Sequence, residues 1–238
     1  MKRLLVFGTF ALLALAACDR KSGDATLDTA PEGWWTFDEG SGDTAADASG
    51  HGNGAMVRDG GWDNGKIDGA LSMDGDNRGI VIVPMSPGLR ATAEAITVMG
   101  WVRRENDQNA ALVSHGYPDL FLGFHGLQFK WEIETVRNKR AACYADPKNV
   151  ATPGQWFHLA GTYDGSTARL YVDGREICSK HLWFGGAIKM PDRPFTISGY
   201  FNAQGGIVDE VYGLVDDVRL YARALDAQEI DTIYQAAR

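Results

Sequence analysis

Short segments in which apolar and polar residues alternate recur along much of the chain. The clearest of them combine this alternation with β-branched or aromatic residues, at positions 79–83, 96–102, 157–163 and 168–174. Successive side chains of a strand point to opposite faces, so an alternating segment can bury one face and leave the other in solvent. The pattern therefore predicts short β-strands, and frequent short strands are typical of a sandwich or jelly roll.

Two Asp-Gly pairs delimit one of these segments. Asp164-Gly165 precedes it and Asp173-Gly174 follows it. Glycine accepts the positive φ that tight hairpin turns require, and Asp-Gly is a preferred pair in such turns. We therefore expect residues 168–172 to form a strand between two tight reversals.

A helical pattern is convincing only at the C-terminal end. Asp226 can cap a helix there, Glu229 stands three residues later as in a capping box, and Leu225 with Ile230 fits a hydrophobic staple. The apolar residues of this segment recur at helical spacing: Ile230, Ile233 and Tyr234. We expect this short helix to lie against the sandwich as a closing element.

Composition and charge restrict the classes of function. The chain has 238 residues, 45% hydrophobic and 11% aromatic, which suits a globular body with a full core in a single domain. Its formal net charge is -8, and loss of an N-terminal leader that contains Lys2 and Arg3 would make it more negative. Nucleic acid is therefore excluded as an expected partner, because binding to it depends on basic side chains that neutralise phosphates.

The N-terminus has the form of a lipoprotein signal peptide. Lys2 and Arg3 precede an apolar run at 4–14, which is shorter than the roughly 20 residues that a membrane-spanning helix needs. The segment Leu-Ala-Ala-Cys that ends at Cys18 resembles the bacterial lipobox. It predicts a cleaved signal at 1–17, a lipid on Cys18 and a membrane-anchored protein of the bacterial cell envelope.

Residues 18–31 are polar and small and lack apolar periodicity, so they are expected to form a flexible tether. The folded domain is then expected to span 32–238. With Cys18 assigned to the lipid, Cys143 and Cys178 remain, and an exported protein meets an oxidising compartment. We predict that these two cysteines form a disulfide, the alternative being two buried free thiols.

Three sets of stretches, in this order, resemble the laminin-G-like jelly-roll family within the concanavalin A-like lectin and glucanase superfamily. They are GWWTFDEGSG at 33–42 with the segments up to 77, ITVMGWVRR at 96–104 with QWFHLAGTYDGSTARLYVDG at 155–174, and VDDVRLYARALDAQEI at 215–230. The resemblance covers nearly all of the expected domain. It implies an all-β, antiparallel two-sheet β-sandwich in which the first and last strands pair and close the domain.

The resemblance also implies one structural calcium ion where the first and last strands meet. Asp216 matches the last-strand acid of related sandwiches, and Glu39 and Asp47 lie in the facing N-terminal loop. Calcium takes 6 to 8 oxygen ligands, so carbonyls or waters would complete the set. The alternative is that Asp47 and Asp216 only form hydrogen bonds at a turn and a strand end.

Enzymes of the glucanase type share this fold and cleave with paired carboxylates, for which Glu132 and Glu134 beside Trp131 are the nearest candidates. The segment departs from the laminarinase-type motif of such enzymes, which looks like E-x-D-x-x-E, because Glu134 replaces the Asp and Arg137 replaces the last acid. A solvated strand face is the simpler interpretation of these glutamates. No nucleophile triad or zinc motif is evident either.

Aromatic residues in turn-rich segments are candidates for a ligand surface. Tyr117, Trp183 and Tyr200 belong to three such segments, and ring faces can stack on the C–H face of a sugar. Core packing or a protein interface explains them equally well. The sequence thus predicts an envelope lipoprotein with a non-catalytic domain that binds a glycan or a protein partner. A glucanase-type hydrolase and a purely structural or adhesive protein are the alternatives, and the oligomeric state is not indicated.

Overall fold

The computed structural model describes residues 30–73, 79–145 and 150–237. The predicted signal peptide at 1–17, the lipidation site Cys18 and nearly all of the tether predicted at 18–31 lie outside these ranges. Among the helices of the described part, none is long and apolar enough to span a membrane.

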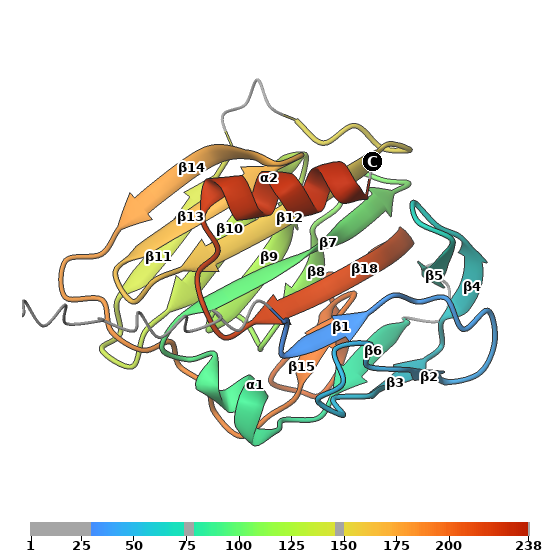
Figure 1. The fold of residues 1–238 in the computed structure, drawn as a ribbon, viewed down its shortest axis with the longest axis horizontal. Coiled ribbons are helices and arrows are strands. Elements are labelled where there is room, and N and C mark those ends of the chain that lie inside the picture. The colour runs from blue at the N-terminus through green and yellow to red at the C-terminus, as the bar shows by residue number, and fades with distance from the viewer. Residues whose placement is uncertain (1–29, 74–78, 146–149, 238) are drawn as a thin grey trace, which may run out of the picture.

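Two antiparallel sheets face each other, as predicted (Figure 1). The first sheet runs in the order β14 (Arg175–His181), β13 (Thr167–Val172), β12 (Trp156–Tyr163), β7 (Ile96–Arg104), β18 (Gly213–Tyr221), β5 (Gly69–Met73) and β4 (Gly61–Asn64), with β1 (Gly33–Trp35) beside β18. The second sheet runs in the order β11 (Arg140–Tyr144), β10 (Gln128–Glu134), β9 (Leu120–His125), β8 (Ala110–Ser114), β15 (Phe195–Ile197), β6 (Ile80–Val83), β3 (Ala55–Arg58) and β2 (Thr44–Ala45). A separate hairpin joins β16 (Tyr200–Phe201) to β17 (Ile207–Val208).

The first and last strands pair, which confirms the closure that the family resemblance implied. In this antiparallel pair Gly33 is opposite Leu220 and Trp35 is opposite Val218. Trp35, Val218 and Leu220 are all buried in the common core. The alternating apolar residues at the two chain ends therefore close one sheet rather than pack at separate sites.

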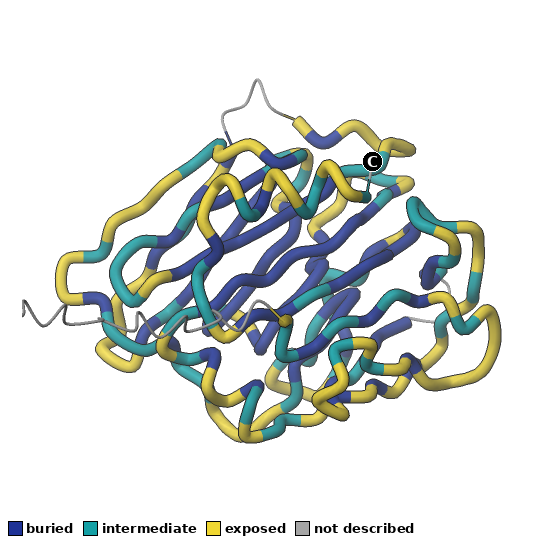
Figure 2. Tube along the Cα trace, viewed as in Figure 1, coloured by how far each residue is buried: buried dark blue, intermediate teal, exposed yellow. Residues whose placement is uncertain are grey.

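Side chains from the inner faces of both sheets fill the core between them (Figure 2). Trp131 of β10 shows how closely the sheets approach. Its indole donates a hydrogen bond to the Thr162 carbonyl oxygen at 3.1 Å, and a side chain at Gly161 would overlap its ring. Gly161 is therefore required by the packing of a large ring against the opposite strand.

The predicted C-terminal helix is confirmed as α2 (Ala227–Ala236), which lies across the outer face of the first sheet (Figure 1). Asp226 accepts a hydrogen bond from the Glu229 amide, and the Glu229 side chain accepts one from the Asp226 amide. Leu225 and Ile230 pack in a second apolar cluster with residues of the sheet. The helix therefore buries an outer face that would otherwise be exposed.

A second, very short helix contradicts the expectation that only the C-terminal segment is helical. This helix, α1 (Pro87–Ala91), begins at Ser86, whose hydroxyl accepts a hydrogen bond from the Leu89 amide at 3.2 Å. Pro87 stands at its first position, where a backbone N–H would have no hydrogen-bond partner within the helix, so proline is tolerated there. One turn of helix offers too few residues for an apolar period, so periodicity does not detect it.

The predicted disulfide is confirmed. Cys143 of β11 and Cys178 of β14 are bonded, with their Cα atoms 5.7 Å apart. Strand β11 is an edge of the second sheet and β14 is an edge of the first sheet. The bond therefore joins an edge strand of one sheet to an edge strand of the other.

Two histidines are buried in the neutral form. Burial lowers the pKa of His158 to about 3 and that of His115 to about 4. His158 lies beneath α2, where its ring contacts the rings of Trp101 and Tyr234 at centroid distances of 5.3 and 5.9 Å. Both histidines would bind a proton more readily in the unfolded chain, where the ordinary pKa is about 6.5.

We expect the free energy of unfolding to fall as the pH drops below about 6.5. Between that pH and the lowered folded-state pKa values the two histidines bind more protons in the unfolded chain, so each removes about 1.4 kcal/mol of stability per pH unit. The buried Asp216 carboxyl, whose pKa is raised to about 7, acts in the opposite direction and offsets part of this slope. Urea unfolding of the protein at about pH 7, 6 and 5 measures this slope. His158→Gln should reduce it, whereas a substitution of the exposed His51 should leave it unchanged, and equal slopes for both variants would contradict the assignment.

Candidate functional site

Three aromatic rings meet on the outer face of the second sheet. Tyr117 lies in the turn between β8 and β9, Phe121 belongs to β9 and Tyr200 to β16. The Tyr117 and Tyr200 rings stack with centroids 5.9 Å apart, and the Phe121 ring meets both edge-on, at 6.0 and 6.3 Å. The fold therefore brings together two of the three aromatic residues that were predicted to bind ligand.

Charged side chains from neighbouring strands lie directly beside these rings. The Glu132 carboxylate is almost fully buried and pairs with Lys130 at 2.6 Å and with the Arg140 guanidinium. Glu132 was expected to lie on a solvated strand face, and this expectation is wrong. The flanking rings and long cationic side chains cover the carboxylate, although it points away from the interior of the sandwich.

The charged group and the rings form one contact network. The Lys130 ammonium lies 4.6 Å from the Tyr117 ring centroid and 4.8 Å from that of Phe121, within the range of cation–π attraction. Arg140 donates a hydrogen bond to the Tyr117 hydroxyl at 2.6 Å. We call this network the tyrosine–glutamate cluster; its members are Tyr117, Phe121, Lys130, Glu132, Arg140, Tyr144 and Tyr200.

The alternation of β10 explains why the charges gather on one face. Trp131 and Ile133 point into the core between the sheets, so Lys130 and Glu132 point outward. Lys130 is opposite Tyr144 on β11, and Glu132 is opposite Phe121 on β9. The cluster thus follows from the register of three adjacent strands.

Tyr200 is held by a contact of its own. Its hydroxyl donates a hydrogen bond to Asp209 at 3.3 Å, and burial together with this carboxylate raises the Tyr200 pKa to about 12. The ring is therefore an uncharged, fixed wall of the cluster at neutral pH.

Trp183 does not join these rings. It follows β14 in a loop, exposes 79% of its surface and contacts the His181 ring with centroids 4.8 Å apart. In the described residues, no ring contact links it to Tyr117 or Tyr200. The structure therefore does not bring all three of the predicted aromatic residues into one surface.

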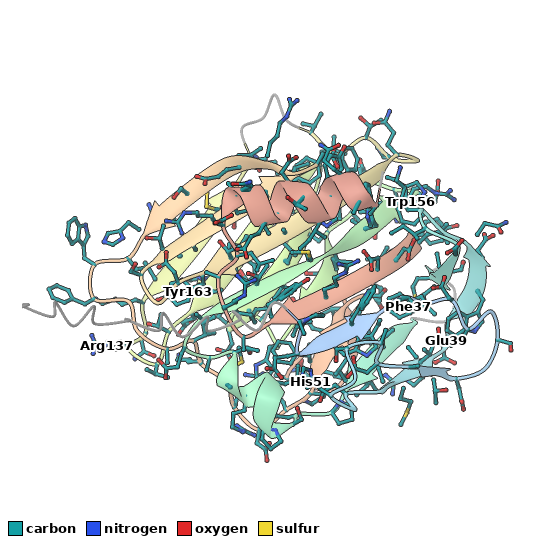
Figure 3. The ribbon with its side chains drawn as sticks, viewed as in Figure 1. Phe37, Glu39, His51, Arg137, Trp156 and Tyr163 are labelled. Carbon is teal, nitrogen blue, oxygen red and sulfur yellow. A yellow bond between two sulfur atoms is a disulfide. The ribbon has the colours of Figure 1, made fainter. Side chains whose placement is uncertain are left out.

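The carboxylates predicted to bind calcium hold backbone amides instead. Asp47 accepts hydrogen bonds from the amides of Trp34, Ser49 and Asn53 at 2.8 to 3.0 Å. Burial would by itself raise the pKa of Asp47, but hydrogen bonds from Ser49, Asn53 and Trp34 outweigh it and lower this pKa. Glu39 accepts one from the Ala46 amide at 2.7 Å, in the loop at the edge of the domain in Figure 3.

Asp216 lies inside β18, fully buried. One carboxylate oxygen accepts hydrogen bonds from the amides of Lys66 and Ile67 at 2.8 Å, and the other has no hydrogen-bond partner in the described structure. Burial, with the nearby Asp217 carboxylate, raises the pKa of Asp216 to about 7.

These three carboxylates are not gathered into one cluster in the described part of the chain. Within residues 30–73, 79–145 and 150–237, no group of three or more His, Cys, Asp or Glu side chains could hold a metal ion. Asp47 and Asp216 each accept hydrogen bonds from backbone amides, as the alternative interpretation of these residues expected. A structural calcium stays a prediction of the family resemblance.

The paired glutamates considered for catalysis are each held by a cation. Glu134 forms an ion pair with Lys189, and Glu132 with Lys130 and Arg140. Each of the two carboxylates is therefore fixed in place by its ion pair.

Sequence reasoning missed Lys130, Arg140, Phe121 and Tyr144 as members of the site. Lys130 could have been found, because it stands two residues before Glu132 and thus on the same face of the strand. The remaining three depend on the pairing of β9, β10 and β11, which local patterns do not specify.

Comparison with known proteins gives a family and a fold. The family model described as the concanavalin A-like lectin/glucanases superfamily matches residues 74–231. Pappalysin-1 of Mus musculus is 27% identical over 116 residues, which cover 41% of this chain and 7% of that protein. Pappalysin-1 of Homo sapiens is 26% identical over 116 residues, which also cover 41% of this chain and 7% of that protein. The chain therefore spans only a small part of these relatives.

Solved structures share the fold at low sequence identity. The binding domain of Paraclostridial Mosquitocidal Protein 1 superposes with a TM-score of 0.71 at 15% identity, covering 87% of this chain and 52% of that chain. The receptor binding domain of botulinum neurotoxin C/D mosaic serotype gives a TM-score of 0.64 at 16% identity, covering 87% and 51%. The chain thus spans about half of each, and the two share its β-sandwich architecture.

Proposed function

Because this chain belongs to the concanavalin A-like lectin/glucanases superfamily, we propose that it is a non-catalytic binding module that recognises a carbohydrate at the tyrosine–glutamate cluster. The observation that carries the proposal is the stacking of Tyr117 and Tyr200 beside the ion pairs of Glu132. Similarity to solved structures that are named as binding domains supports a binding role.

The cluster offers the two kinds of contact that a sugar needs. Tyr117 and Tyr144 expose 43% and 41% of their surface, so their rings can receive the apolar C–H face of a pyranose. The Arg140 guanidinium is part-exposed beside them and can donate hydrogen bonds to hydroxyl groups. The ion pairs hold these groups in place before a ligand arrives, which reduces the entropy cost of binding.

The same ion pairs support a non-catalytic role. Glu132 and Glu134 point to one side of β10, as a glucanase pair would, yet each is held by its own cation. Release of a proton to a leaving group would require one of them to be protonated first. Hydrolysis of β-glucans by the protein, lost in Glu132→Gln, would overturn this part of the proposal.

We place the module in the bacterial cell envelope, attached through a lipid on Cys18. The leader pattern in the sequence supports this location, although Cys18 itself lies outside the described residues. The bond between Cys143 and Cys178 also supports it, because structural disulfides persist mainly in exported proteins.

A test of the binding site compares two exposed tyrosines. Tyr117→Ala is expected to weaken binding of the best ligand from a glycan array by about fivefold to thirtyfold, because loss of a central ring contact costs about 1–2 kcal/mol. Calorimetry measures the change. Tyr212→Ala is the matched control, since Tyr212 exposes 42% of its surface and makes no ring contact within the described part of the chain.

Equal losses in the two variants would place the sugar elsewhere. Absence of binding to every glycan, together with Tyr117-dependent capture of one purified envelope protein, would replace the carbohydrate by a protein partner at the same cluster.

A further inference from the structure

Exposed apolar side chains gather at one end of the sandwich. Trp183 and Phe184 lie side by side in the chain after β14, and each exposes 79% of its surface. Val136, in the turn between β10 and β11, exposes 59%. The Val136 amide donates a hydrogen bond to the Ala187 carbonyl oxygen at 2.9 Å, so the two loops are joined.

The backbone that carries the two aromatics is firmly held. The Leu182 amide donates a hydrogen bond to the Ser166 carbonyl oxygen at 2.7 Å. The Gly186 amide donates one to the Gly165 carbonyl oxygen at 2.8 Å, and the Tyr163 hydroxyl donates one to the Gly186 carbonyl oxygen at 2.9 Å. The loop therefore holds both rings in an exposed position. They form an exposed apolar patch, and such patches mark interaction sites.

Basic side chains surround these apolar residues. Arg137 and Lys139 flank Val136 in its turn, and Lys180 precedes the aromatic pair on β14; all three are exposed. In the described structure none of the three has a carboxylate partner within ion-pair distance. Figure 3 shows Arg137 at the end of the sandwich opposite Glu39, so these three cations are presented at one end of a chain whose net charge is -8.

We propose that this end, formed by Val136, Arg137, Lys139, Lys180, Trp183 and Phe184, is a membrane-contact surface that inserts its two aromatic rings into the headgroup region of an anionic bilayer. Tryptophan prefers the membrane interface, where its ring is apolar and its N–H stays hydrated. Lysine and arginine side chains near an anionic surface are attracted to its negative charge. Together the apolar tip and the cations match the two components of an interfacial anchor.

A bilayer fits this surface better than a protein pocket does. Adjacent rings at a protruding tip, with cations beside them, can enter a fluid interface without a complementary shape. The net negative charge of the chain opposes its approach to an anionic surface, so contact through an end that presents cations is favoured. The proposal is independent of the carbohydrate site, whose residues are different.

The experiment measures how deeply Trp183 enters a bilayer. The full-length chain is added to vesicles of phosphatidylcholine with brominated acyl chains, with and without about one quarter phosphatidylglycerol. Quenching of tryptophan fluorescence is compared between the wild type and Trp183→Phe, so that the difference reports Trp183 alone. The readout does not depend on whether the N-terminal segment also attaches the chain.

We expect bromine quenching of the Trp183 component to be at least about twofold stronger in the anionic vesicles. Arg137→Glu combined with Lys139→Glu should reduce it at least about twofold, and Met56→Ser, which alters another exposed apolar residue, should not. Identical quenching in wild type and Trp183→Phe would overturn the proposal. Shielding of Trp183 only after a purified envelope protein is added would assign the surface to a protein partner instead.

Discussion

Replacing Glu132 with alanine is expected to lower the free energy of unfolding by about 3–5 kcal/mol, because removal of one partner leaves a buried charge uncompensated. The Lys130 side chain is only 5% exposed and lies at 2.6 Å from the Glu132 carboxylate. Without that carboxylate, the ammonium keeps only its contacts with aromatic rings. Urea unfolding, followed by tryptophan fluorescence at pH 7, measures the loss.

Two further variants separate this effect from a general loss of contacts. Glu134→Ala removes a neighbouring ion pair whose lysine is one third exposed, and it should cost about 1 kcal/mol or less. Lys130→Met combined with Glu132→Ala should recover part of the stability, because the buried positive charge is also removed. A double variant no more stable than Glu132→Ala would show that the Lys130 charge is not the source of the loss.

Removing the disulfide is expected to lower the free energy of unfolding by roughly 4 kcal/mol, the loop-closure value for its sequence separation of 35. The bond links edge strands of opposite sheets, so in its absence the β11 and β14 edges are held only by side-chain packing and by their own strand pairs. The variant that replaces both Cys143 and Cys178 by alanine avoids leaving a free thiol. Thermal and urea unfolding compare it with the oxidised wild type.

Reduction of the wild type provides the matched control, since it breaks the same bond without changing the side chains. The reduced protein and the double variant should show similar losses, apart from the difference between a buried thiol and a methyl group. If both unfold at the same urea concentration as the oxidised protein, the bond does not contribute to stability as described.

Local patterns were enough to predict several of the strands and the C-terminal helix. The Asp-Gly pairs bound β13, and Gly165 and Gly174 have φ values of 89° and 78°. The capping box at Asp226 places the start of α2 correctly. These features depend on residues close together in the chain, whose conformational preferences act before any distant contact forms.

The candidate site was predicted only in part. Tyr117 and Tyr200 were chosen as aromatic residues in turn-rich segments, and the fold brings them into contact. Trp183 was chosen by the same rule and lies in a separate loop. Glu132 was taken for a solvated residue because alternation indicates only that a side chain points away from the core, and it does not say what covers that side chain.

The sequence by itself determined several of the strands and their apolar faces, the start of the C-terminal helix and the two cysteines that pair. Only the tertiary structure decided that Lys130, Glu132 and Arg140 meet beneath Tyr117, that Asp47 and Asp216 hold separate turns, and that Val136 lies beside the loop of Trp183. The physical reason is that strand alternation and capping are short-range effects. The register between strands and the stacking of loops from distant segments depend on the packing of the whole core.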